Sequence, residues 1–112
     1  MRVGPATRHG SVIRLRPDKQ EEYVRLHAAV WPEVLDRLHA SGIRNYTIYL
    51  HDGWLFSHFE HVGDDYAADM AAIAAHDVTR KWWELTEPCQ ERLPGTPDGE
   101  QWTTMTEVFH VD

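Results

Sequence analysis

Residues 43–62 read IRNYTIYLHDGWLFSHFEHV, and this stretch decides the fold because it contains two strand patterns around a tight turn. Residues 43–50 combine alternation with β-branched and aromatic side chains, and residues 54–62 repeat that pattern. The Asp-Gly pair at 52–53 is typical of a two-residue hairpin turn, because such a turn needs residues that tolerate a positive φ. The stretch therefore predicts a β-hairpin in the middle of the chain.

The segment before the hairpin predicts one strand and two short helices. We expect a strand over residues 11–16 and a helix over residues 19–29, separated by a Pro-Asp pair. Aromatic or apolar side chains recur in this helical stretch one turn apart: Tyr23, Leu26, His27 and Val30. A second helical piece begins at Pro32 and ends at the Ser-Gly pair 41–42.

The segment after the hairpin predicts a helix, a short aromatic segment and a final strand. The helix begins at residues 63–65 and ends before the His-Asp pair 76–77, and residues 78–85 present two adjacent Trp. A loop rich in Gly, Pro and Asp covers residues 94–100. Residues 102–111 are expected to form the last strand.

The expected order of strand, helix, strand, strand, helix, strand is that of the split βαβ in a ferredoxin-like α+β fold. Residues 1–7 are expected to form a disordered or loosely ordered N-terminal extension, and residues 8–112 a single domain. Both helical regions would cover one face of an antiparallel sheet. In so short a chain the other face is most simply covered by a second copy, which predicts a homodimer with a dimeric α/β barrel.

Composition limits the classes of partner. The 112 residues include 11 Lys and Arg against 18 Asp and Glu, and the net charge of −7 disfavours nonspecific binding to nucleic acid or to anionic lipid. No apolar stretch approaches the roughly 20 residues that cross a bilayer, and no signal-peptide pattern is visible. The negative net charge instead fits a neutral or cationic small molecule as the partner. Cys89 is the single cysteine and cannot form an intramolecular disulfide, so we expect a cytoplasmic protein.

Tyr23 and His27 are the first candidate site residues. They are one helical turn apart, so one helix face presents a phenol beside an imidazole, with Trp31 a turn further on. An imidazole titrates near neutral pH and suits proton transfer, and a neighbouring phenol can orient it or bind a hydroxyl group. The same spacing is also that of an ordinary core-facing stripe, so both interpretations stay open.

Tyr46, Trp82 and Trp83 are the other candidate site residues. Alternation along the expected strand places Tyr46 on the face opposite to Asn45 and Tyr49. The flat faces of the two adjacent indoles can stack on the C–H surface of a sugar. Alternatively, one Trp belongs to the core and the other to a dimer contact.

A metal site is a competing hypothesis, because eight His is a high count. His58 and His61 project to opposite faces of a strand, and the adjacent pair His76-Asp77 chelates poorly. The sequence also lacks a Gly-rich phosphate loop and a Ser nucleophile elbow. We therefore expect no metal and favour acid/base chemistry on a neutral ligand.

Five short segments lie in a fixed order between residues 8 and 111. They are Glu22-Tyr23-x-x-x-His27, Val30-Trp31-Pro32-Glu33, Asn45-Tyr46-x-Ile48, Arg80-Lys81-Trp82-Trp83 and Glu107-Val108-Phe109. In this order the chain resembles the L-rhamnose mutarotase family. The resemblance implies a homodimer of ferredoxin-like subunits that interconverts the α and β anomers of a 6-deoxy-hexose without a cofactor or a metal.

By position, the resemblance implies a proton donor and four sugar contacts. His27 would be the proton donor, and the sugar contacts would be Tyr23, Tyr46, Trp82 and Trp83. Residues 84–90 and the loop after them differ from the enterobacterial pattern of the family. Because of this difference, the substrate can be L-rhamnose, L-fucose or another 6-deoxy sugar. The second proton-transfer group is not identifiable from the sequence.

Two other functions fit the same fold. One is a noncatalytic sugar-binding module, which would bind a sugar without changing the rate of anomer exchange. The other is a small oxygenase or haem-handling protein, although the sequence carries no axial-ligand motif for haem. Rates of anomer exchange and a haem absorbance band separate these possibilities from the mutarotase.

Overall fold

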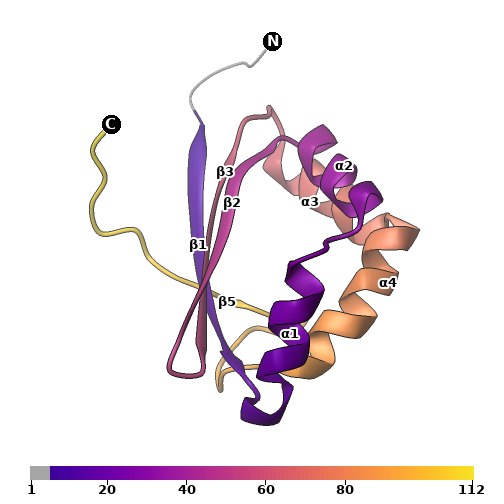
Figure 1. The fold of residues 1–112 in the computed structure, drawn as a ribbon. Coiled ribbons are helices and arrows are strands. Elements are labelled where there is room, and N and C mark those ends of the chain that lie inside the picture. Colours follow the sequence, from indigo (N-terminus) through magenta and orange to yellow (C-terminus); the bar gives the residue numbers. More distant parts are fainter. Residues whose placement is uncertain (1–5) are drawn as a thin grey trace.

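The computed structural model describes residues 6–112 and shows one sheet covered by helices on a single face (Figure 1). In chain order the elements are β1 (Thr7–Leu15), η1 (Pro17–Lys19), α1 (Gln20–His27), α2 (Pro32–Ala40), β2 (Ile43–His51), β3 (Trp54–His61), α3 (Tyr66–Ala75), α4 (Asp77–Thr86), η2 (Glu87–Cys89), β4 (Gln90–Glu91) and β5 (Thr103–Thr104). The sheet order is β2-β3-β1-β4, with β5 also paired to β1, and every pairing is antiparallel. The predicted ferredoxin-like α+β fold is confirmed.

The central hairpin, β2 and β3, forms where the sequence predicts it. Leu50 pairs with Leu55 across the turn, and Asp52 and Gly53 both have positive φ values, 51° and 77°. These values fit the hairpin turn whose twist matches that of the strands. Near the start of β2 the register shifts between Arg44 and Thr47, so this strand carries a bulge next to the pocket described below.

Local capping explains where the later helices begin and end. The Asp65 side chain accepts a hydrogen bond from the backbone N–H of Ala68 and so caps α3. His76 ends α3 and, with its ring nitrogen near the backbone N–H of Thr79 at 3.3 Å, caps α4. The two helices are therefore consecutive with a sharp bend between them, and α4 runs back along the sheet with its Trp pair.

The core lies between the inner face of the sheet and helix α1. Its buried members are Ile13, Leu15, Tyr23, Leu55 and Cys89, and Ile48 and Trp102 pack against them. The alternation of β1 explains the first two, because Ile13 and Leu15 point to the helices while Arg14 stacks on Trp54 on the outer face, 4.2 Å from the ring centroid. Trp102 brings the C-terminal part of the chain onto this core.

The predicted last strand, residues 102–111, is wrong in length. Two short strands replace it, β4 opposite Arg14 and Leu15 and β5 opposite Ser11 and Val12, because the intervening loop divides the free edge of β1 into two. After β5 one more backbone bond joins the N–H of Met105 to the carbonyl of Gly10, at 2.8 Å. Beyond it the chain leaves the sheet on the side opposite the helices (Figure 1).

The expectation for the N-terminus is only partly covered, since residues 1–5 lie outside the described residues. Within the described part, Thr7 already pairs with His61, so β1 begins earlier than the predicted start of order at Arg8. The strand also extends well before the predicted residues 11–16. Residues 7–10 are part of the strand because β3 is long enough to pair with them. The local sequence pattern of residues 7–10 does not reveal this partner.

His58 and His61 do not form a metal site with each other. His61 is 3% exposed and faces the helices, where its Nε2 lies 2.7 Å from the Asp69 carboxylate. A Cβ on Gly63 would lie 2.6 Å from that carboxylate, so only glycine fits beside the pair. Over residues 6–112 there is no group of three or more His, Cys, Asp or Glu that could hold a metal ion, and none of these helices is long and apolar enough to cross a membrane.

Candidate active site

Two adjoining cavities lie between the sheet and the helices, and together they form one pocket. The first has a volume of about 530 Å³ and we call it the apolar half, lined mainly by Val30, Val34, Leu35, Leu38, Ile43 and Ile73. The second has a volume of about 440 Å³ and we call it the polar half, with His9, Ser11, Ser57, Glu87, Gln90, Glu100 and Gln101 in its lining. Both halves share a wall, formed by His27, Tyr46, Ile48, Phe59, Met70, Trp82 and Trp83.

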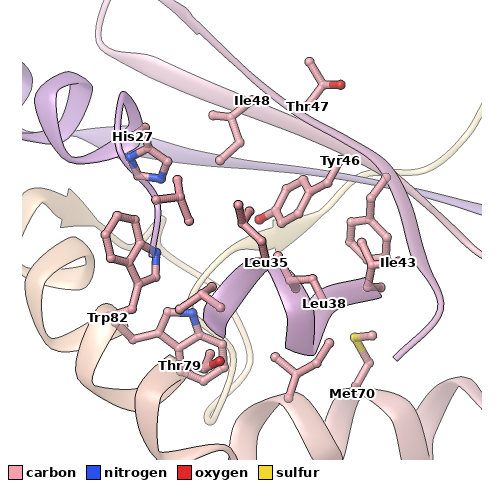
Figure 2. Close-up of a pocket in the computed structure, with 15 residues that line it drawn as sticks. His27, Leu35, Leu38, Ile43, Tyr46, Thr47, Ile48, Met70, Thr79 and Trp82 are labelled. Carbon is pink, nitrogen blue, oxygen red and sulfur yellow. The ribbon is translucent and has the colours of Figure 1, made fainter. Parts of the chain in front are cut away.

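His27 stands in this shared wall, at the last position of α1. Its Nδ1 lies 2.9 Å from the backbone carbonyl of Tyr23. Because a carbonyl oxygen only accepts, Nδ1 carries a proton and donates it in this bond. The other ring nitrogen, Nε2, is therefore the atom that can exchange a proton with a ligand. In Figure 2 the ring lies beside Trp82, whose edge it meets at a centroid distance of 5.4 Å.

Tyr23 lies one turn before His27, with the two ring centroids 4.3 Å apart. The side chain is 4% exposed, and its hydroxyl lies 3.2 Å from the side-chain nitrogen of Gln90. Burial raises the pKa of this phenol far above its ordinary value, so the hydroxyl keeps its proton at neutral pH. Tyr23 is thus both a core residue and a hydrogen-bonding group at the pocket.

Tyr46 reaches the pocket from the opposite side, on β2. Asn45 before it has a φ of 52°, the left-handed conformation that Asn tolerates better than most residues, and this marks the bulge. The Tyr46 ring extends toward Leu35 with its hydroxyl at the inner end (Figure 2), and desolvation raises the pKa of that hydroxyl. Tyr49 is 65% exposed on the other face, so the predicted alternation is confirmed.

Trp82 and Trp83 both line the pocket from α4. Trp82 is 5% exposed and meets Trp31 edge to face at 5.3 Å, so it belongs to the interior as well as to the wall. Trp83 is partly exposed and also lines both halves. The structure therefore brings all five sequence-predicted site residues around one cavity.

Most residues of the polar half carry no signal in the sequence. Gln90 is 6% exposed and joins two segments, since it also accepts a hydrogen bond of 3.2 Å from Gln101. Ser11 and Ser57 share a hydrogen bond of 2.6 Å on neighbouring strands. Gln90 is 67 residues from Tyr23, and no local motif marks it. The Pro88-Cys89 pair before it was a possible sign of a structured turn, but not of a pocket residue.

The fold places the chain in a structural class of small α+β proteins with one antiparallel sheet covered by helices on a single face (Figure 1). The crystal structure of an L-rhamnose mutarotase from Formosa agariphila aligns with a TM-score of 0.74 at 22% identity, covering 95% of this chain and 99% of that one. Tetracenomycin F2 cyclase from Streptomyces glaucescens, a polyketide cyclase, aligns with a TM-score of 0.65 at 18% identity, covering 94% and 95% of the two chains. At these identities the two structures establish the fold alone.

Sequence comparison identifies the family within this class. The family described as L-rhamnose mutarotase matches residues 8–111. The L-rhamnose mutarotase of Lactiplantibacillus plantarum is 38% identical over 111 residues, with 94% of this chain and 98% of the relative covered. That of Oceanobacillus iheyensis is 32% identical over 107 residues, with the same coverage. The chain belongs to the L-rhamnose mutarotase family.

Proposed function

We propose that this protein is a cofactor-independent mutarotase that interconverts the α and β anomers of L-rhamnose or of a related 6-deoxy-hexose. The observation that carries the proposal is the position of His27. Its Nδ1 is held by a backbone carbonyl, and its ring stands where an apolar cavity meets a polar one. A 6-deoxy sugar has the matching character, with a methyl group at one end and hydroxyl groups around the ring.

The chemistry needs one proton added and one removed. A protonated His27 Nε2 gives its proton to the ring oxygen while the anomeric hydroxyl gives its own proton to a water molecule, so that the bond between the ring oxygen and the anomeric carbon breaks and an open aldehyde forms. On closure the same water returns its proton to the new anomeric oxygen. Rotation of the aldehyde and closure on its other face give the second anomer, with the neutral imidazole taking the proton back. A positioned acid/base group contributes typically about 10² to 10⁴-fold to the rate, which suffices for a reaction that already proceeds slowly in water.

The remaining site residues hold the sugar. The hydroxyls of Tyr23 and Tyr46 bind sugar hydroxyl groups, and both stay protonated because burial raises their pKa values. Trp82 and Trp83 pack on the apolar face of the sugar and on its methyl group. The apolar half beside them is lined mainly by aliphatic side chains, with Thr47 and Thr79 as the hydroxyl groups outside the shared wall, so it receives the methyl end.

The proposal is tested by NMR saturation exchange between the anomeric protons of L-rhamnose, with and without a catalytic amount of protein. Parallel samples contain L-fucose and D-glucose. We expect faster exchange for L-rhamnose, a smaller effect or none for L-fucose and none for D-glucose. Sugar binding seen by Trp fluorescence without faster exchange would instead indicate a noncatalytic binding module, and faster exchange only for L-fucose would replace the substrate.

We also propose that the protein works as a cytoplasmic homodimer. The sheet face away from the helices carries Tyr49, 65% exposed, and Phe56, 36% exposed, and the departing C-terminal segment carries Val108 and Phe109, 94% and 80% exposed. Apolar surface of this kind is typical of an interface. The buried free Cys89 is compatible with a reducing compartment. Light scattering at micromolar concentration should give twice the chain mass, and a monomer mass would contradict the dimer.

A further inference from the structure

Gln90 is a buried polar side chain of the pocket that has no place in the proposed chemistry. Its side-chain nitrogen lies 3.2 Å from the Tyr23 hydroxyl, and its side-chain oxygen accepts from Gln101 at 3.2 Å. The residue is 6% exposed and forms the first position of β4, at the edge of the polar half. Burying an amide so fully is costly unless its hydrogen bonds are made, so both bonds fix its orientation.

The hydrogen bond from Gln101 to the Gln90 oxygen determines which group of the Gln90 amide is turned to Tyr23. An amide oxygen only accepts and an amide nitrogen only donates. Because Gln101 donates to the Gln90 oxygen, the Gln90 nitrogen is the group turned to Tyr23, and it donates to the phenol oxygen. The Tyr23 hydroxyl then still has its own proton to donate, and within residues 6–112 no acceptor is bonded to it.

We propose that Gln90 is a positioning residue that makes Tyr23 a hydrogen-bond donor toward the sugar. Because its oxygen accepts from Gln90, the Tyr23 hydroxyl turns its proton into the polar half. His27 is beside it, since the ring centroids of Tyr23 and His27 are 4.3 Å apart. A sugar oxygen there receives this proton in a hydrogen bond. Gln101 acts one step further out, because it holds the Gln90 amide in the orientation that donates.

The inference deepens the proposed function, and its first test is a reversal of the Tyr23 hydrogen bond. Gln90→Glu keeps the size of the side chain, but an ionised carboxylate accepts from Tyr23 and turns its proton away from the pocket. At about pH 8 we expect L-rhamnose exchange to fall about tenfold, the effect of one lost hydrogen bond. At about pH 5 the introduced carboxyl, whose pKa burial raises, is protonated, donates to Tyr23 again and restores the rate relative to wild type at the same pH.

Other titratable groups near Tyr23 require matched controls. They are His9 on β1, His27 on α1, Tyr46 on β2, Tyr66 on α3, Glu87 and Cys89 on η2 and Glu100 in the loop. Gln20→Glu adds the same charge at an exposed position of α1 and should follow the wild-type pH profile. In a Tyr23→Phe background, Gln90→Glu should cause no further pH-dependent loss, since the hydroxyl it reverses is absent.

Two further measurements keep the inference open to disproof if the carboxyl variant folds poorly or the protein proves not to be a mutarotase. Gln90→Met removes the donor without adding charge, and it should lower the exchange rate several-fold at all pH values. The ¹³Cζ resonance of Tyr23, assigned with Tyr23→Phe, needs no sugar; it should move with pH in Gln90→Glu and with the loss of the donor in Gln90→Met. A resonance unmoved by both variants, or a Gln90→Glu rate loss that is the same at every pH, would overturn the proposal.

Discussion

The two halves of the pocket differ in how the chain builds them, and the difference explains the surroundings of His27. The apolar half, about 530 Å³, is enclosed by α2, β2, α3 and α4, whose hydrophobic patterns are visible in the sequence. The polar half, about 440 Å³, is enclosed by β1, η2, β4 and the loop before β5, which meet only in the folded chain. The shared wall holds His27, so a ligand there meets apolar surface on one side and hydrogen-bonding groups on the other.

Removing the imidazole from the shared wall is expected to have the largest effect on activity. His27→Ala should lower the acceleration of L-rhamnose anomer exchange by about 10² to 10⁴-fold, because the proposed proton-transfer group is lost while the other lining residues of both halves remain. NMR saturation exchange measures the rate. His39→Ala, at an exposed position of α2, is the matched control and should keep the wild-type rate. Full activity in His27→Ala would remove this residue from the mechanism.

The two Trp residues separate the contribution of the wall to folding from its contribution to binding. Trp82→Ala should lower the free energy of unfolding by about 3–5 kcal/mol, since the indole is 5% exposed and packs on Trp31 and His27. Trp83→Ala should cost less stability, because Trp83 is partly exposed, while weakening sugar binding. Urea unfolding and Trp fluorescence titration give the two quantities. Equal losses of stability in both variants would contradict the distinction.

The apolar half should discriminate against a hydroxyl group at carbon 6. L-mannose is L-rhamnose with that hydroxyl, and we expect its kcat/KM to be lower by about tenfold to hundredfold, the range an apolar pocket achieves against one added hydroxyl. Leu35→Ser offers that hydroxyl a hydrogen-bond partner in the apolar half, and it should lower the ratio of kcat/KM for L-rhamnose to kcat/KM for L-mannose. Rates for the two sugars on both proteins check this, and an unchanged ratio would place carbon 6 elsewhere.

The smallest expected effect concerns stability and the polar half. His9 stacks between Phe59 and Tyr66, and its pKa is lowered from 6.5 mainly by burial, with repulsion from His61 and His58 adding to it. Between the lowered pKa and 6.5 the unfolded chain binds more protons, so stability rises with pH over this window and is complete above it. Replacing His9 with Phe should remove this pH-dependent gain in the free energy of unfolding. The gain is less than about 1 kcal/mol, because the ring is partly exposed, and urea unfolding at several pH values measures it.

Much of the fold could be predicted because its signals are local. The Asp-Gly turn fixes the register of β2 and β3, and helical spacing places Tyr23 and His27 on one face. The last strand could not be predicted, because its extent depends on how much of the β1 edge is left after β4 pairs with Arg14 and Leu15. The apolar residues of segment 105–111 do not reveal whether a partner strand is available.

The site divides in the same way. His27, Tyr46 and the Trp pair could be chosen from residue type and spacing, and they are the residues of the shared wall. Gln90 and Gln101 could not, because a glutamine becomes informative only when burial and its hydrogen-bond partners are known. The partner of Gln90, Tyr23, is 67 residues away in the chain, and the partner of Gln101 is Gln90 itself.

The central claim, that the sugar lies across the two halves with its anomeric carbon at His27, is tested most directly by NOEs between bound L-rhamnose and methyl-labelled protein. The account predicts NOEs from the sugar methyl group to Leu35, Leu38 or Ile43 in the apolar half, and none from the anomeric proton to these residues. The anomeric proton should instead show NOEs to the rings of His27 and Tyr23. NOEs from the sugar methyl group to Trp102 or Thr104 in the polar half would contradict the account.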